Sequence, residues 1–173
     1  MKNITKLFAI ALVTLGTAST SFAQSVATAT ASTSAKIIVP ISIEKTTDMN
    51  FGTVVPSAAA GNVVLGYNDD RTANLGVTLL NSSTAQKTAV FTVSGENNSS
   101  FNVTVPTAAI DLTGTGLSSG MTASSFVADC GASTSLSGTT KVIKVKATLN
   151  VPANAIAGTY SNASGLFVTV NYN

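Results

Sequence analysis

The sequence predicts an all-β fold, a sandwich or barrel of short antiparallel strands. Apolar and polar side chains alternate with a period of two residues in most segments after residue 35, as in strands with one face on a core. Gly, Pro and Asn residues separate these segments at short intervals. No segment after residue 23 repeats apolar side chains at helical spacing over three turns.

The N-terminus has the three parts of a secretory signal peptide, which we assign to residues 1–23. Lys2 and Lys6 form a positive start, residues 7–15 form an apolar segment, and small residues at the −3 and −1 positions precede Gln24. A membrane-spanning helix needs about 20 apolar residues, more than this segment has. We therefore expect an exported protein of the periplasm, outer surface or extracellular space, with no transmembrane segment or lipid anchor.

The charge of the remaining chain is balanced. Two of the nine Lys and Arg residues lie in the signal peptide, so seven basic side chains face seven acidic ones. Nucleic-acid binding requires a basic face, and attraction to an anionic membrane surface requires a basic cluster. We therefore expect no nucleic-acid partner, and the remaining length suffices for one domain with its own core.

Residues 24–35 form an N-terminal extended segment in which small apolar and hydroxyl side chains alternate. This segment is either a flexible leader or a weakly specified strand, because small side chains bury little area and leave the register loose. As a strand it would be an edge strand or a donor strand. The β-sandwich domain is expected over residues 36–173.

The first expected strand of the domain, residues 36–45, places Ile37, Val39, Ile41 and Ile43 on one face. Its Pro40 removes a main-chain donor, which favours a sheet edge or a kink. Two later strands are expected to form a hairpin because a loop containing Gly joins them. Small-residue loops are expected at 57–61 and 131–138. The two hairpin strands are residues 89–93 and 101–105. The other later strands are expected at residues 49–55, 62–67, 71–80, 109–112, 121–128, 140–151 and 159–173, the last interrupted near 162–165.

Side chains that perform catalysis are scarce. The sequence contains no His, which excludes Ser-His-Asp and Cys-His nucleophilic machinery and zinc sites with imidazole ligands. A glycosidase needs two carboxylates across a cleft, but nearly all acidic residues lie at predicted turns, where Asp caps the backbone. We expect no enzyme activity, no catalytic, cofactor-binding or metal-ligating residues and no cofactor. The seven acidic residues are Glu44, Asp48, Asp69, Asp70, Glu96, Asp111 and Asp129.

The densest charge cluster is Asp69-Asp70-Arg71. Calcium binds carboxylate oxygens but needs six to eight oxygen ligands, and Arg71 opposes a cation. A turn with a local ion pair is therefore favoured over a calcium site.

Cys130 is the only cysteine, so no internal disulfide can form. The favoured interpretation is a small buried or tolerated thiol. An intermolecular disulfide is the alternative, and it stays open because Asp129 and Gly131 predict a loop around the thiol.

Aromatic side chains that could bind sugars are few. The chain has no Trp, and most Tyr and Phe residues lie on the inward register of a strand. Tyr67 beside a turn and Phe167 on the outer face of the last strand are the exceptions, and two separated aromatics offer little of a sugar platform.

Several short segments carry a family resemblance. They are residues 37–43, 49–53, 149–152, 157–161 and 168–172. Over nearly its full length after the signal peptide, the chain resembles the bacterial secreted family catalogued as domain of unknown function 4402. The Asn50-Phe51-Gly52 and Gly158-Thr159-Tyr160-Ser161 motifs and the final strand are also similar to spore coat protein U domains, which occur in pilins of archaic chaperone–usher pili.

The second resemblance implies an immunoglobulin-like antiparallel β-sandwich, of the kind that a neighbour's strand can complete. The chain departs from those pilins in lacking the cysteines that usually pin their early strands. We expect a non-catalytic structural or adhesive subunit, pilin-like or at the cell surface, that assembles with protein partners through strand addition. The alternatives are a periplasmic or surface module that binds a ligand, foremost a glycan, and an exported hydrolase.

Overall fold

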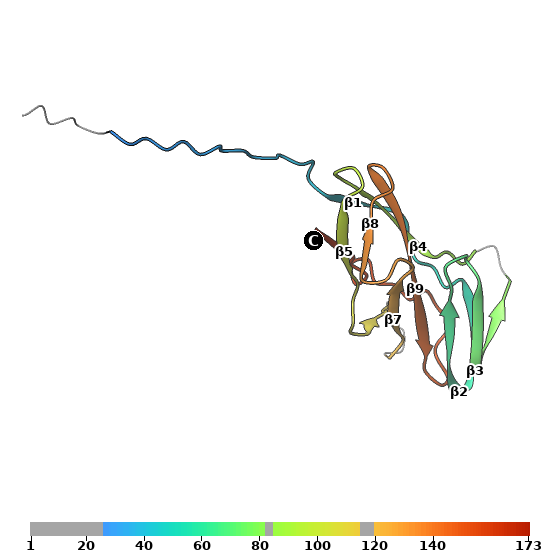
Figure 1. Cartoon of the computed structure of the whole chain (residues 1–173). Coiled ribbons are helices and arrows are strands. Elements are labelled where there is room, and N and C mark those ends of the chain that lie inside the picture. The colour runs from blue at the N-terminus through green and yellow to red at the C-terminus, as the bar shows by residue number, and fades with distance from the viewer. Residues whose placement is uncertain (1–25, 82–84, 115–119) are drawn as a thin grey trace, which may run out of the picture. The chain divides into compact units, whose positions relative to one another are not determined.

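The computed structural model describes residues 26–81, 85–114 and 120–173 (Figure 1). The chain divides into two units, Met1–Lys36 and Ile37–Asn173. In the first unit, residues 26–36 are exposed and belong to no strand. The signal peptide expected at residues 1–23 lies outside the described residues.

The second unit is built from antiparallel strands, and the described residues contain no helix. A larger sheet has the order β1-β4-β9-β2-β3, with β7 also pairing with β9, and β6 with β7; a smaller sheet has the order β10-β5-β8. This arrangement confirms the predicted all-β sandwich. The strands are β1 (Ser42–Thr47), β2 (Thr53–Leu65), β3 (Arg71–Leu80), β4 (Ala89–Ser94), β5 (Ser100–Thr104), β6 (Ile110–Asp111), β7 (Thr122–Ala128), β8 (Ser133–Ser135), β9 (Thr140–Val151) and β10 (Thr169–Tyr172).

Strand β9 has the bounds that the sequence predicts, and it is the centre of the larger sheet. Its first half pairs with β4, and its second half pairs with β2 and β7. Every second side chain from Ile143 to Val151 is buried, and the residues between them are partly exposed. One face of β9 therefore lies on the core, as its alternation predicts.

The main core lies between the two sheets. Ile143 and Val93 of the larger sheet and Phe101, Val103 and Val170 of the smaller sheet belong to one buried cluster. A second cluster lies against the paired strands β2 and β3 and contains Val63, Val77, Met121, Leu149 and Val151. The aliphatic rows that the alternation identifies thus hold the two layers together.

The expected hairpin of residues 89–93 and 101–105 is wrong. Its strands form as β4 and β5, but β4 pairs with β1 and β9, whereas β5 pairs with β8 and β10. The connecting loop binds the turn before β9 instead, with the Gly95 N–H donating to the Thr139 carbonyl at 3.0 Å and the Asn98 N–H to the Gly138 carbonyl at 2.9 Å. The chain therefore crosses between sheets, and the apolar rows of the two strands both face the main core.

The loop expected at residues 57–61 is also wrong, because β2 continues through it. β2 pairs with β3 from Thr53 onward, with a register shift between Pro56 and Gly61, but its pairing with β9 begins only at Gly61. Pro56 thus lies where β2 pairs with β3 but not with β9, a half-open position of the kind in which strands tolerate proline.

The first expected strand is shorter than the alternation predicts. β1 begins at Ser42, after Pro40, and lies at the edge of its sheet as that proline indicates. Ile37 and Val39 are 94% and 55% exposed rather than buried. Ile41 and Ile43 pack against the main core.

Two further boundaries differ from the prediction. The expected loop at residues 131–138 contains the short strand β8, which the Ser-rich sequence conceals. The expected strand at residues 159–173 is reduced to β10, preceded by a single bridge between Thr113 and Ser161.

Truncation of the core row of β9 tests the assigned faces. Ile143 is fully buried, so Ile143→Ala is expected to lower the free energy of unfolding by about 2–5 kcal/mol. The neighbouring Val142 is 51% exposed, and Val142→Ala is expected to cost less than about 1 kcal/mol. Chemical denaturation of both variants measures the difference, and equal losses would show that the faces are assigned wrongly.

Candidate functional site

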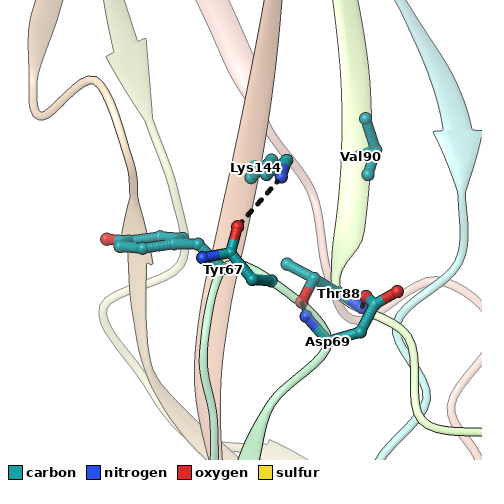
Figure 2. A pocket seen from close by; sticks show the side chains of 6 residues that line it. Tyr67, Asp69, Thr88, Val90 and Lys144 are labelled. Carbon is teal, nitrogen blue, oxygen red and sulfur yellow. Dashed lines mark hydrogen bonds between the residues drawn. The ribbon is translucent and has the colours of Figure 1, made fainter.

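A shallow polar depression of about 290 Å³ lies at the turn between β2 and β3 (Figure 2). The Lys144 ammonium donates to the Asn68 side-chain oxygen at 3.4 Å. Figure 2 shows the Tyr67 ring directed away from Asp69 and Thr88. The lining residues are Tyr67, Asn68, Asp69, Thr88, Val90 and Lys144.

The polar atoms on one side of this depression bond to one another. The Asp69 carboxylate accepts from the Lys87 ammonium at 2.8 Å and from the Thr88 N–H at 2.7 Å. The Thr88 hydroxyl donates to the Gly66 carbonyl at 2.5 Å and accepts from the Asp69 N–H at 3.3 Å. These bonds fasten the β2–β3 turn to the start of β4 and leave few polar atoms for a ligand.

The turn expected at Asp69-Asp70-Arg71 is present, but Lys87 rather than Arg71 supplies the ion pair of Asp69. The Arg71 guanidinium donates to main-chain carbonyls, to Phe51 at 2.7 Å and Thr53 at 2.9 Å. Across the part of the chain that the structure describes, no group of three or more His, Cys, Asp or Glu side chains could hold a metal ion.

Most of the other acidic side chains also lie at turns or strand ends. Asp129 accepts from the Lys144 N–H at 3.1 Å, and Asp48 pairs with Lys45 at 2.5 Å on an exposed surface. Asp70 accepts from the Asn68 N–H at 3.2 Å. Glu44 lies on β1 and Asp111 on β6, and Glu96 takes part in the contact described below. The bonds of Asp70 and Asp129 show the backbone-capping role that the turn positions predict, whereas Asp48 binds a side chain.

The two candidate sugar-binding aromatics do not share this depression. Tyr67 lines it, but Phe167, which is 55% exposed, does not. The Lys146 ammonium lies 5.2 Å from the centroid of the Tyr67 ring and covers one of its faces. Burial, followed by the nearby charges of Asp129 and Cys130, raises the pKa of the Tyr67 phenol.

Cys130 lies in the turn after β7, as its neighbours predict, and packs partly buried against the main core. Burial, and then the charge of Asp129, raises the pKa of its thiol. The nucleophilic thiolate is therefore disfavoured at this position.

A second feature, which sequence reasoning missed, fixes Val39 where the chain enters the domain. The Tyr172 hydroxyl accepts from the Glu96 N–H at 2.6 Å and donates to the Val39 carbonyl at 2.8 Å. The Val39 N–H donates to the Glu96 carboxylate at 3.1 Å. We call these three residues the Val39 clamp. They are far apart in the sequence, so no local pattern could reveal the contact.

Within the part of the chain that the structure describes, the strand that carries Tyr172 has one free edge. The Asn173 N–H donates to the Ser100 carbonyl of the neighbouring chain segment at 3.3 Å, and the register continues with Asn171 opposite Asn102. In antiparallel pairs, bonded and non-bonded positions alternate. The main-chain groups of Val170 and Tyr172 therefore point away from β5, which is the only strand that pairs with β10 among the described residues.

The ion pair of Asp69 predicts a pH dependence of stability. The hydrogen bond from Lys87, followed by that from the Thr88 N–H, lowers the pKa of Asp69 below its ordinary value of 3.8. A lowered folded-state pKa contributes stability above pH 3.8, and this contribution is lost as the pH falls through the folded-state value. Asp69→Asn should therefore destabilise the protein at pH 7 and less so at pH 2.5. Thermal unfolding at both pH values checks this, and an equal loss at both would contradict it.

Removal of the Tyr172 hydroxyl tests the Val39 clamp. Tyr172→Phe leaves the Glu96 N–H and the Val39 carbonyl without this partner, and is expected to cost about 1–2 kcal/mol. Hydrogen exchange of the Glu96 amide should become faster. Tyr160→Phe is the matched control, because it removes a tyrosine hydroxyl that donates to the Ile156 carbonyl, four residues away in the sequence, at 2.8 Å. Unchanged Glu96 exchange in Tyr172→Phe would contradict the clamp.

Comparison with known proteins identifies a family. The family model described as "Domain of unknown function (DUF4402)" matches residues 41–172. No curated protein and no solved structure matches. Among the described residues, no helix has the length and apolar character that crossing a membrane requires.

Proposed function

The chain belongs to the DUF4402 family, and we propose that it is an exported, non-catalytic structural or adhesive subunit that assembles by strand addition. Residues 24–35 act as the donor strand, and an open sheet edge of another subunit accepts it. The similarity of its motifs to spore coat protein U domains, found in pilins, supports the same function.

One observation carries the proposal: the chain combines a free sheet edge with an unpaired segment suited to fill such an edge. Residues 26–35 are exposed, belong to no strand and contain no charged side chain, and small apolar and hydroxyl side chains alternate from Ala27 to Ser32. In strand addition, main-chain hydrogen bonds supply affinity and alternate side chains supply specificity. The Ala, Ser and Thr side chains of this segment occupy little volume, so they can pack at the edge of a core that leaves little free space.

The alternative function, glycan binding, has less support. The polar atoms of Asp69 and Thr88 in the β2–β3 depression bond to the protein itself, and Lys146 covers one face of Tyr67. Aromatic stacking and free polar groups, which a sugar site combines, are both limited there.

Size-exclusion chromatography tests the donor segment. The chain from Gln24 to Asn173 is expected to form oligomers whose size increases with concentration, and the chain from Lys36 to Asn173 is expected to stay monomeric. Thr30→Pro in the longer chain is the matched control: it keeps the length but cannot pair fully as a strand, because Pro lacks an N–H. Identical monomers from all three would contradict the proposal, provided that circular dichroism shows all three folded.

A further inference from the structure

We propose that the accepting edge is β10, and that it takes residues 26–35 of a second copy of this chain. The alanine row of that segment faces the main core. This inference rests on the proposed function and identifies the surface on which assembly occurs.

The other sheet edges carry the features that proteins use to block strand addition. β1 has a register shift between Lys45 and Thr47 and places Lys45 opposite the core residue Phe91. β3 is interrupted at Leu75, whose φ is 53°, next to the register shift in β2. A bulge twists an edge strand, and a charge on the inward row opposes pairing.

The remaining edges are bulged or short. β7 has a register shift between Ser124 and Val127, β6 has two residues and β8 has three. By contrast, β10 pairs in regular register with β5 from Thr169 to Tyr172 and has no charged side chain. Among the described strands, β10 is therefore the edge with the fewest obstacles to a new neighbour.

The chain before β10 continues the same inward row. Leu166 and Val168 pack against the main core together with Tyr172, although pairing with β5 begins only at Thr169. A donor strand on the free edge would extend β10 back to residue 166. The accepting edge would then span seven residues, roughly 23 Å, and residues 26–35 are long enough to cover it.

The space beside this edge suits small side chains. β1 contacts β10 without a hydrogen-bonded ladder between them, and Ile41 just before β1 and Ile43 within it are already partly buried against the main core. Large donor side chains would have to displace these residues, whereas Ala27, Ala29 and Ala31 would not. The alanine row is therefore compatible with the limited space between β1 and β10.

The chain leading to the Val39 clamp favours a second copy over the chain's own segment. To lie on its own β10, the segment would have to reverse direction shortly before Val39. Residues 26–39 contain no Gly, Pro, Asn or Asp, the residues that favour tight turns most, and only Ser32 and Ser34 of the weaker turn formers. Residues 37–39 are β-branched, and Pro40 restricts Val39 to extended conformations. A reversal there is therefore unfavourable, which favours a second copy over the chain's own β10 as the acceptor.

Engineered disulfides between two copies test the edge. All variants carry Cys130→Ser in the chain from Gln24 to Asn173. One variant with Asn171→Cys, on the outward row of β10, is mixed with variants carrying Thr28→Cys, Thr30→Cys or Ser32→Cys on the hydroxyl row. At least one mixture should give a predominant disulfide-linked dimer on non-reducing electrophoresis, because directly opposed Cβ atoms lie within disulfide range.

Two controls separate the outcomes. Ala31→Cys lies on the opposite row and should not link to Asn171→Cys, and Thr78→Cys on β3 should not link to any hydroxyl-row variant. Linkage at Thr78→Cys, or oligomers without linkage at Asn171→Cys, would overturn the choice of β10 but leave assembly standing. If the unmodified chain forms no oligomer, the proposed function fails together with this inference.

Discussion

The central constraint of this fold is that β9 must pair with three strands. β4 binds its first half, while β2 and β7 lie on either side of its second half. Its inward aliphatic row contacts both buried clusters, through Ile143 in one and Leu149 in the other. Because no internal disulfide is available, burial of this row and the ladders along β9 supply the stability of the domain.

Because both edges of β9 are paired, the distribution of strands between the two sheets is unequal. The larger sheet takes most of the strands, so the smaller one is left with β10, β5 and β8. Strand β10 closes the main core with Val170 but, among the residues that the structure describes, has a pairing partner on one side only. Tyr172 then links this strand to the entry of the chain through the Val39 clamp. The geometry thus brings the free edge and the start of the domain together.

The sequence predicted what depends on local alternation. The faces and bounds of β9, the extent of β3 and the edge position of β1 follow from side-chain period and from Pro40. It could not predict pairings that depend on the whole fold. The loop between Ser94 and Ser100 resembles a hairpin loop. However, β4 and β5 pack against opposite sides of the main core, so the chain crosses from the larger sheet to the smaller one between them.

The candidate site was less predictable for the same reason. The turn at Asp69 and its capping role follow from residue type, whereas its ion-pair partner Lys87 comes from a separate loop. The Val39 clamp joins three distant residues and leaves no pattern in the sequence. The free edge of β10 requires knowledge of which strands pair, which periodicity alone does not give.

Residue-resolved hydrogen exchange tests the account most directly. In the chain from Lys36 to Asn173, the amides of Ile143 and Asn171 should exchange slowly, and those of Val170 and Tyr172, which point away from β5, should exchange rapidly. In the assembled chain from Gln24 to Asn173, Val170 and Tyr172 should become as protected as Asn171. Slow exchange of Val170 and Tyr172 already in the shorter chain, or no change on assembly, would contradict the account.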